Sequence, residues 1–138
     1  KVLVSDEFIR GNYYTKFPGG GLEFGEGTRD CLAREFMEEM NLKVHVGEHL
    51  YTTDFFQMSA FDPEHQIVSI YYRVHPLEAI TVAIRETPFD FDNSQMAVYH
   101  STGETETFRM FPISNFDASC VHLPIDKVVA DIVKSIHQ

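Results

Sequence analysis

Cysteine is scarce in this chain, and basic residues are outnumbered by acidic ones. Only Cys31 and Cys120 occur among 138 residues, too few for a disulfide framework and not spaced as a metal-binding or redox pair. Lysine and arginine number 11 against 21 acidic residues, which gives a formal net charge of -10. Because nucleic acids and anionic membranes bind cationic surfaces, this charge argues against both as partners.

Long apolar runs are also missing. No stretch approaches the roughly 18 to 20 residues that a membrane-spanning helix needs, and no signal-peptide pattern opens the sequence. We therefore expect reduced cysteines and a cytoplasmic protein. The sequence starts at Lys1 rather than at methionine, which is compatible with a lost N-terminal piece. With 43% hydrophobic residues, the length suits a single domain, residues 1–138, with one core.

Strand-like and helix-like patterns alternate along the sequence. Residues 77–103 show no pattern that predicts an element. Aromatic residues on the expected strands, such as Phe55, Phe56, Tyr71 and Tyr72, are interpreted as core rather than as base-stacking groups. Strands interspersed with helices predict an α/β or α+β fold. Strands are predicted over 1–8, 9–17 and 105–113, a hairpin over 50–61 and 66–75 with its turn at 62–65, and helices over 28–41 and 124–137.

The first predicted helix is unusually acidic. It starts at Thr28, a suitable N-cap, and ends near Asn41. At about 100° per residue, Glu35, Glu38 and Glu39 fall within an arc of roughly 100° and share one face. Because like charges repel and acids near a helix end oppose its dipole, we expect a cation against this face. Magnesium suits carboxylate oxygens and bridges to phosphates, whereas a solvated acidic surface is the alternative.

A glycine-rich turn precedes this helix at a fixed spacing. Gly20 is followed after five residues by Glu26 and, after seven more, by the run Arg34, Glu35, Phe36, Met37, Glu38, Glu39, Met40, Asn41, Leu42. This spacing resembles the Nudix box, G-x5-E-x7-R-E-U-x-E-E-x-G-U with U a bulky apolar residue, which is the signature of the Nudix hydrolases. Eight of the nine fixed positions match. The exception is Asn41 in place of a glycine at a helix end, where asparagine is the next most tolerant residue.

The resemblance implies a fold and an activity. The fold is a mixed β-sheet sandwiched between helices, and family members usually carry a further strand before the one expected at Lys1. The implied reaction is hydrolysis of a nucleoside diphosphate linked to another group, by water attack on phosphorus, with Mg²⁺ or alternatively Mn²⁺. The substrate would be a small-molecule nucleotide: a nucleoside triphosphate, a nucleotide sugar or a dinucleotide. A homodimer is a family-level expectation.

The resemblance also implies roles for the matching residues. Glu35, Glu38, Glu39 and the Gly20 carbonyl resemble the metal ligands of the family. Glu26 and Arg34 resemble the residues that orient those ligands.

Four residues are therefore predicted to take part in catalysis: Glu39, Glu38, Arg34 and Glu104. Glu39 is the first candidate to orient or deprotonate the attacking water. Some family members place an additional glutamate before the last sheet strand. Glu104 is preferred for that role over Glu106.

Other interpretations are weaker or stay open. Residues 90–95 begin like a calcium loop, but Gln95 and Ser101 occupy positions that need glycine and glutamate. The accessory positions of ADP-ribose and diadenosine polyphosphate hydrolases are not met at Gln57, Met58 or Ser59. A non-catalytic Nudix-like regulator that binds a nucleotide is the main alternative function. An isomerase acting on an allylic diphosphate is a further option, without supporting cysteine and glutamate placement.

Overall fold

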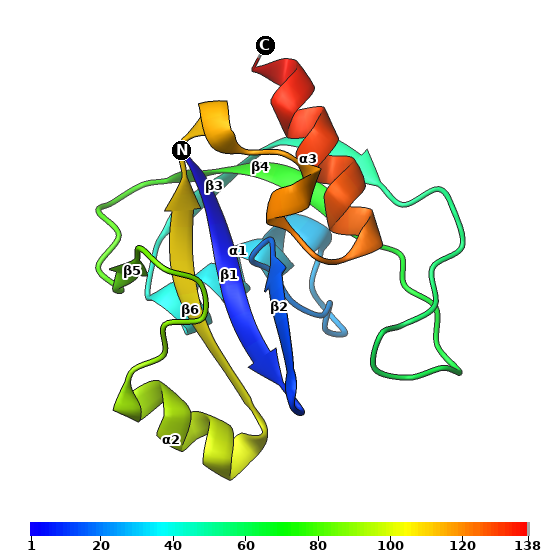
Figure 1. Ribbon diagram of the computed structural model, residues 1–138. Helices are drawn as coiled ribbons and strands as arrows, with labels where there is room; N and C mark the ends of the chain where they lie inside the picture. Colours follow the sequence, from blue (N-terminus) through cyan, green and yellow to red (C-terminus); the bar gives the residue numbers. More distant parts are fainter. Residues whose placement is uncertain (138) are drawn as a thin grey trace. The chain divides into compact units, whose positions relative to one another are not determined.

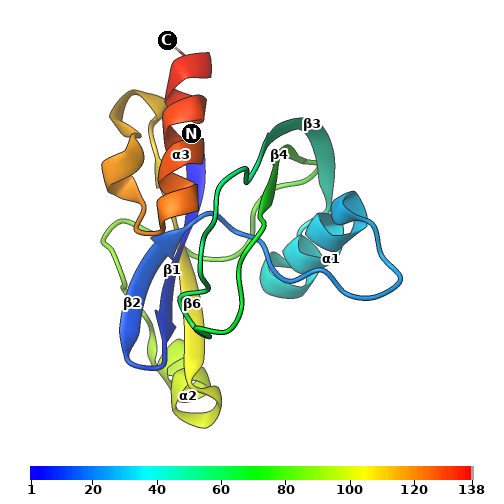
Figure 2. The ribbon, with the colours of Figure 1, turned by 90° about the vertical axis from the view of Figure 1, so that its right-hand side faces the viewer.

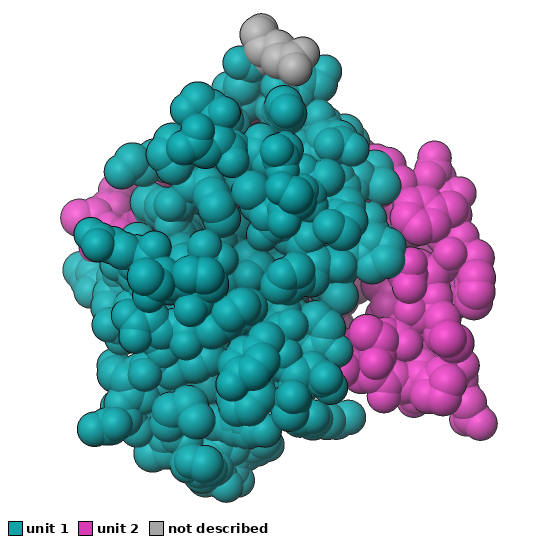
Figure 3. Space-filling model, in the orientation of Figure 1, with its two compact units in different colours: residues 1–18, 81–138 teal, residues 19–80 magenta. Residues whose placement is uncertain are grey.

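Strands and helices alternate along the chain, as the sequence predicts. The computed structural model describes residues 1–137 (Figure 1). The chain divides into two compact units, Lys1–Pro18 with Thr81–Gln138 and Gly19–Ile80, called here the first and second unit and described separately (Figure 3). The elements are β1 (Val2–Ile9), β2 (Asn12–Lys16), α1 (Thr28–Met40), β3 (Val44–Thr52), β4 (Ile70–Pro76), β5 (Ile84–Arg85), α2 (Asn93–Thr102), β6 (Glu104–Phe111), η1 (Ile113–Asn115), η2 (Ala118–Cys120) and α3 (Pro124–Ile136).

The first unit contains a mixed sheet with the strand order β2-β1-β6-β5 (Figure 1). Strand β1 is antiparallel to β2 and β6, whereas β5 runs parallel to β6. Arg10 and Gly11 join β1 to β2 with φ angles of 47° and 84°. Two left-handed residues form the two-residue turn whose twist matches that of a hairpin. The strands predicted over 1–8, 9–17 and 105–113 are therefore confirmed, with boundaries shifted by one to three residues.

Helix α3 contributes to the core of the first unit. Pro124 occupies its first turn, where the missing N–H leaves no hydrogen bond unmade. The apolar residues of this helix are only partly buried, since Ile125 and Val129 are buried whereas Ile136 is 51% exposed. Figure 2 shows α3 and α2 at opposite ends of the strands of this unit. The core cluster comprises Val4, Phe116, Val121 and Ala130.

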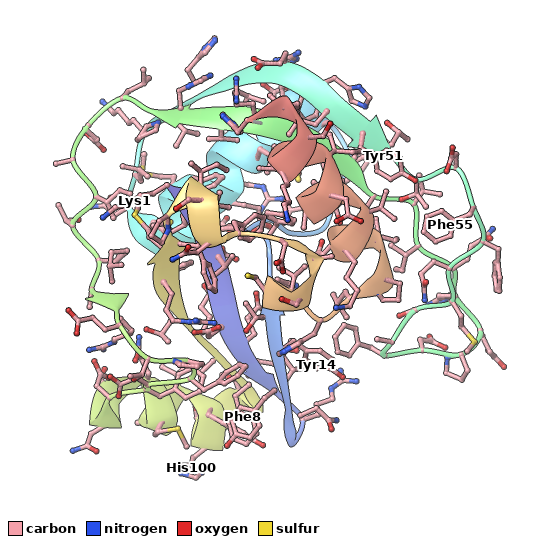
Figure 4. The ribbon with its side chains drawn as sticks, turned by 45° about the horizontal axis from the view of Figure 1, so that its top comes forward. Lys1, Phe8, Tyr14, Tyr51, Phe55 and His100 are labelled. Atoms are coloured by element: carbon pink, nitrogen blue, oxygen red, sulfur yellow. The ribbon has the colours of Figure 1, made fainter. Side chains whose placement is uncertain are left out.

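Helix α2 lies in the segment to which the sequence assigned no element. The Asp92 carboxylate accepts the Gln95 backbone N–H at 2.8 Å, and the Gln95 side chain accepts the Asp92 N–H at 2.9 Å. This reciprocal pair is a capping box, so the residues that began like a calcium loop start a helix instead. No residue of α2 is buried, and the helix has no apolar stripe from which its period could be recognised. Phe8 of β1, labelled in Figure 4, packs on Tyr99 of α2 with ring centroids 3.9 Å apart.

A buried ion pair crosses the sheet of the first unit. Asp6 on β1 is fully buried, and its carboxylate accepts hydrogen bonds from Nε and Nη2 of Arg109 on β6. The Thr15 hydroxyl donates to the same carboxylate at 2.7 Å, and the Phe89 backbone N–H donates at 3.2 Å. Phe89 has a left-handed φ of 56°. Four donors therefore compensate for the burial of one carboxylate.

The second unit combines α1 with the antiparallel hairpin β3-β4. A hairpin is confirmed here: the strand predicted over 66–75 overlaps β4 but starts four residues too early, whereas the strand predicted over 50–61 is misplaced. Residues 53–69 form a long loop that contains a single bridge, between Met58 and Gln66. The aromatic residues that suggested a strand are exposed in this loop, Phe55 at 41% and Phe56 at 75%, so interpreting them as core was wrong (Figure 4). Strand β3, the first strand of the hairpin, was missed because histidine, glutamate and glycine interrupt its apolar residues.

Candidate metal-binding site

Both ends of helix α1 are set by local hydrogen bonds. Gly27 rather than Thr28 is the N-cap, and its backbone N–H donates to the Asp30 carboxylate at 3.3 Å. At the other end Asn41 adopts a left-handed conformation, with φ 48° and ψ 46°, and its N–H donates to the Met37 carbonyl at 3.0 Å. The structure thus confirms the left-handed helix end that was expected at Asn41.

Two adjacent residues attach the start of α1 to the hairpin β3-β4. The Thr28 hydroxyl lies 2.7 Å from the Tyr72 hydroxyl. The Arg29 guanidinium stacks over the Tyr72 ring at 4.6 Å and donates to the carbonyls of Val46 and Gly47 at 2.7 and 2.6 Å. These contacts fix the position of the helix within its unit. Sequence periodicity could not predict them, because they join residues far apart in the chain.

The glycine-rich loop receives the Glu35 carboxylate at Gly20. A Cβ atom at residue 20 would lie 2.2 Å from the Glu35 Cδ and 2.3 Å from its Oε1. Such separations are far below any van der Waals contact, so a side chain at this position would displace the carboxylate. The Glu35 side chain is only 13% exposed. The predicted ligand residues Gly20 and Glu35 are thus brought together.

Arg34 is the central cation of the site. Its Nε and Nη2 donate to the two Glu26 oxygens at 3.0 and 2.7 Å, which makes a two-point ion pair. Nη2 also donates to the Gly21 carbonyl at 3.0 Å. Because Glu26 and Gly21 both belong to the loop, Arg34 ties the glycine-rich loop to the helix.

The remaining nitrogen of Arg34 contacts two predicted metal ligands. Nη1 donates to Oε1 of Glu35 at 2.9 Å and to Oε2 of Glu38 at 3.2 Å. Glu38 is 58% exposed, whereas Glu35 is largely shielded. One guanidinium therefore partly neutralises the acidic face of the helix and reduces the repulsion expected among these carboxylates.

The ion pair changes the acidity of both partners. The hydrogen bond from Arg34 lowers the pKa of Glu26 to about 2, and the Glu23 backbone N–H, which donates to Glu26 at 2.9 Å, acts in the same direction. The hydrogen bond to Glu26 in turn raises the pKa of Arg34 above its usual range. Both groups are therefore charged throughout the physiological pH range.

The groups present at the site fit a hard divalent cation. They are carboxylate and carbonyl oxygens, which Mg²⁺ and Mn²⁺ prefer, and the space at Gly20 admits a carboxylate where a side chain would exclude it. Within residues 1–137 no three acidic, histidine or cysteine side chains are gathered closely enough to hold a metal ion. Glu39 follows Glu38 on α1 and is half-buried. The assignment of Gly20, Glu35, Glu38 and Glu39 as ligands stays a prediction.

Glu104, the residue predicted as the additional glutamate, belongs to the first unit. Glu104 is the first residue of β6 and is exposed. Glu106 lies further along the strand, half-buried, and accepts a hydrogen bond from the Ser5 hydroxyl at 3.3 Å. The role of Glu104 likewise stays a prediction.

Two groups near the site were not singled out from the sequence. The Cys31 thiol is buried and donates to the Gly21 carbonyl at 3.5 Å, and burial raises its pKa. Glu23 lies 3.7 Å from Arg34 Nη1 and is 67% exposed. The spacing of the box contains no signal for either residue, because both occupy variable positions of the pattern.

Comparison with protein families identifies this chain. The NUDIX domain model matches residues 1–131. The chain therefore belongs to the NUDIX family, as the box indicated, and its mixed α/β fold agrees with that membership. Members of the family are hydrolases, which supports a pyrophosphohydrolase type of activity in general terms, and they generally use divalent metals. No helix within residues 1–137 has the length and apolar character needed to cross a membrane.

Proposed function

We propose that this protein is a magnesium-dependent hydrolase that cleaves a nucleoside diphosphate linked to another group. The substrate would be a nucleoside triphosphate, a nucleotide sugar or a dinucleotide. Mn²⁺ would be an alternative to Mg²⁺ as the metal. The observation that carries this proposal is the arrangement around Gly20, where a backbone without a side chain accommodates the Glu35 carboxylate beside Arg34 and Glu38. A purely solvated acidic surface would not require such a close approach.

In this proposal the carboxylates of α1 hold the metal. Glu35, Glu38, Glu39 and the Gly20 carbonyl would be its ligands. When bound, the metal would neutralise the pyrophosphate, polarise phosphorus and lower the pKa of a water molecule.

The other residues of the box would act on these ligands. Arg34 and Glu26 hold the glycine-rich loop against α1, where the Cα of Gly20 faces the Glu35 carboxylate. Glu39 would orient the attacking water or accept its proton, and Glu104 is the second candidate for that task.

The proposal also covers the domain organisation, the cellular location and the oligomeric state of the protein. The NUDIX match covers all of the second unit and most of the first, which supports a single domain over residues 1–138, although Gln138 lies outside the described residues. Cys31 and Cys120 are both free thiols, which supports a reducing, cytoplasmic location. A homodimer is proposed from the family resemblance, and light scattering after size-exclusion chromatography tests it.

The activity is tested with a substrate panel. Phosphate release, coupled to a pyrophosphatase or a phosphatase, is measured for nucleoside triphosphates, nucleotide sugars and dinucleotides with Mg²⁺, with Mn²⁺ and with a chelator. Metal-dependent turnover of one class supports the proposal and names the substrate. Tight binding of a nucleotide without turnover of any substrate would contradict it and favour a regulatory protein.

A further inference from the structure

We propose that Arg34 is the resident counter-ion of the α1 carboxylates, and that a divalent cation enters the site by exchange with one end of its guanidinium group. This inference rests on the proposed function, because it concerns the same carboxylates. The exchange makes Arg34 a positioning residue that also competes with the metal.

The two ends of the guanidinium have different surroundings. Nε and Nη2 are anchored by the two oxygens of Glu26, whose side chain is 14% exposed, and by the Gly21 carbonyl. Nη1 donates to Glu35 and Glu38, at 2.9 and 3.2 Å, and the Glu23 carboxylate lies 3.7 Å away. One end is therefore held in a shielded two-point ion pair, and the other is shared between two acceptors, one of which is mostly exposed.

The charges at the site favour such an exchange. Three carboxylates, those of Glu26, Glu35 and Glu38, lie within hydrogen-bond distance of one guanidinium. Because Arg34 supplies a single positive charge, this group keeps an excess of negative charge that attracts a cation. A divalent cation bound by Glu35 and Glu38 would repel Nη1 and compete for the same oxygens.

The anchor at Glu26 keeps the exchange local and reversible. When Nη1 gives up Glu35 and Glu38, the bonds to Glu26 and Gly21 hold the guanidinium in place. When the cation leaves, Nη1 returns to the same carboxylates and limits their repulsion. The metal-free site thus stays folded, at the expense of metal affinity.

Mn²⁺ binding tests this exchange directly. Free Mn²⁺ is measured by electron paramagnetic resonance with wild type, Arg34→Gln and Glu64→Gln, the last a control that removes an exposed carboxylate in the loop before β4. We expect Arg34→Gln to bind Mn²⁺ more tightly, on the order of tenfold, because the competing cation is gone. It should also unfold at a lower temperature without metal and gain more from added Mn²⁺. Weaker or unchanged Mn²⁺ binding in folded Arg34→Gln would overturn the inference.

A measurement on the wild type removes the dependence on folding of the variant. Arginine side-chain NMR signals are followed during titration with Mg²⁺, with Arg34→Lys used to assign Arg34. We expect the Arg34 Nη hydrogens to exchange faster with water at saturating Mg²⁺, whereas its Nε hydrogen stays protected by Glu26. Unchanged Nη signals at saturation would overturn the exchange.

These outcomes separate this inference from the proposed function. Tighter Mn²⁺ binding by Arg34→Gln, combined with no turnover of the substrate panel by wild type, would support the exchange and contradict the hydrolase. Mn²⁺-dependent turnover by wild type, combined with weaker Mn²⁺ binding by Arg34→Gln, would support the hydrolase and overturn the exchange. Failure of both proteins to bind Mn²⁺ would contradict both proposals.

Discussion

Glu35 and Gly20 approach each other so closely that a methyl group at residue 20 would have to push the Glu35 carboxylate aside. The Glu35 Cδ lies 2.2 Å from the position that a Cβ atom of residue 20 would take. The neighbouring Gly21 has no such neighbour, since nothing lies within 4 Å of its Cβ position. The steric restriction on a side chain therefore applies to Gly20, the first position of the box, and not to Gly21.

Gly20→Ala should displace the Glu35 carboxylate and impair metal binding. Because misplacement of a group at a reaction centre by about 1 Å can lower the rate 100-fold, we expect a loss of kcat/KM of about that size. Mn²⁺ affinity should fall as well. Gly21→Ala is the matched control, since it adds the same methyl group to open space and should leave both quantities nearly unchanged. Equal effects of the two substitutions would refute the steric role of Gly20.

Asn41 replaces the final glycine of the box in a left-handed conformation. Asn41→Gly should raise the free energy of unfolding by up to about 1 kcal/mol, because glycine adopts this conformation without strain from a Cβ. Asn41→Ala should lower it by about 1 kcal/mol. Urea denaturation measures both changes. A stabilising alanine or a destabilising glycine would show that the helix end is not left-handed in solution.

Glu7 on β1 should make the stability depend on pH. Burial raises its pKa, although Lys16 at 3.4 Å counteracts the effect. Because the folded state binds this proton more tightly than the unfolded chain, the free energy of unfolding should fall as the pH rises above the usual carboxyl pKa of 4.5. Glu7→Gln should therefore be more stable than wild type at pH 7 but not at pH 4.

Urea denaturation between pH 4 and pH 8 tests this linkage. Lys16→Met is a second variant with the opposite expected effect. It should make the free energy of unfolding fall more steeply as the pH rises, because it removes the charge that favours ionised Glu7. A wild-type curve that matches that of Glu7→Gln across this range would contradict the assignment.

The buried pair of Asp6 and Arg109 should be essential for stability. Arg109→Met leaves the Asp6 carboxylate buried without its cation, which should lower the free energy of unfolding by about 3 to 5 kcal/mol. Arg73→Met removes a more exposed ion pair, with Glu48, and should lower it by less than about 1 kcal/mol. Thermal denaturation of the two variants gives the comparison. Similar losses in both would mean that the Asp6 pair is not buried in solution.

Local sequence patterns predicted some elements well and others not at all. The helices over 28–41 and 124–137 were recognised because apolar residues recur at helical spacing. Helix α2 was missed since none of its residues is buried, although Asp92 and Gln95 form a capping box that the sequence does contain. The aromatic residues around Phe55 suggested a strand, but they lie in a loop and are exposed.

The candidate site was predictable to the extent that its residues are close in sequence. The spacing from Gly20 to Leu42 indicated the family and named Glu35, Glu38 and Glu39. It contained no information on the contact of Nη1 of Arg34 with Glu35 and Glu38, nor on the attachment of α1 through Tyr72. Both depend on tertiary packing, which a single sequence does not reveal.

The most direct test of the proposed function compares Glu38→Gln with Glu64→Gln, which removes an exposed carboxylate in the loop before β4. The measurement is metal-dependent turnover of the best substrate from the panel, with the free energy of unfolding determined for each variant. We predict that Glu38→Gln lowers turnover on the order of 100-fold or more while its stability stays equal or rises slightly, because a metal ligand is lost and repulsion is relieved. Glu64→Gln should retain wild-type turnover. Full activity in Glu38→Gln would contradict a metal site on the acidic face of α1.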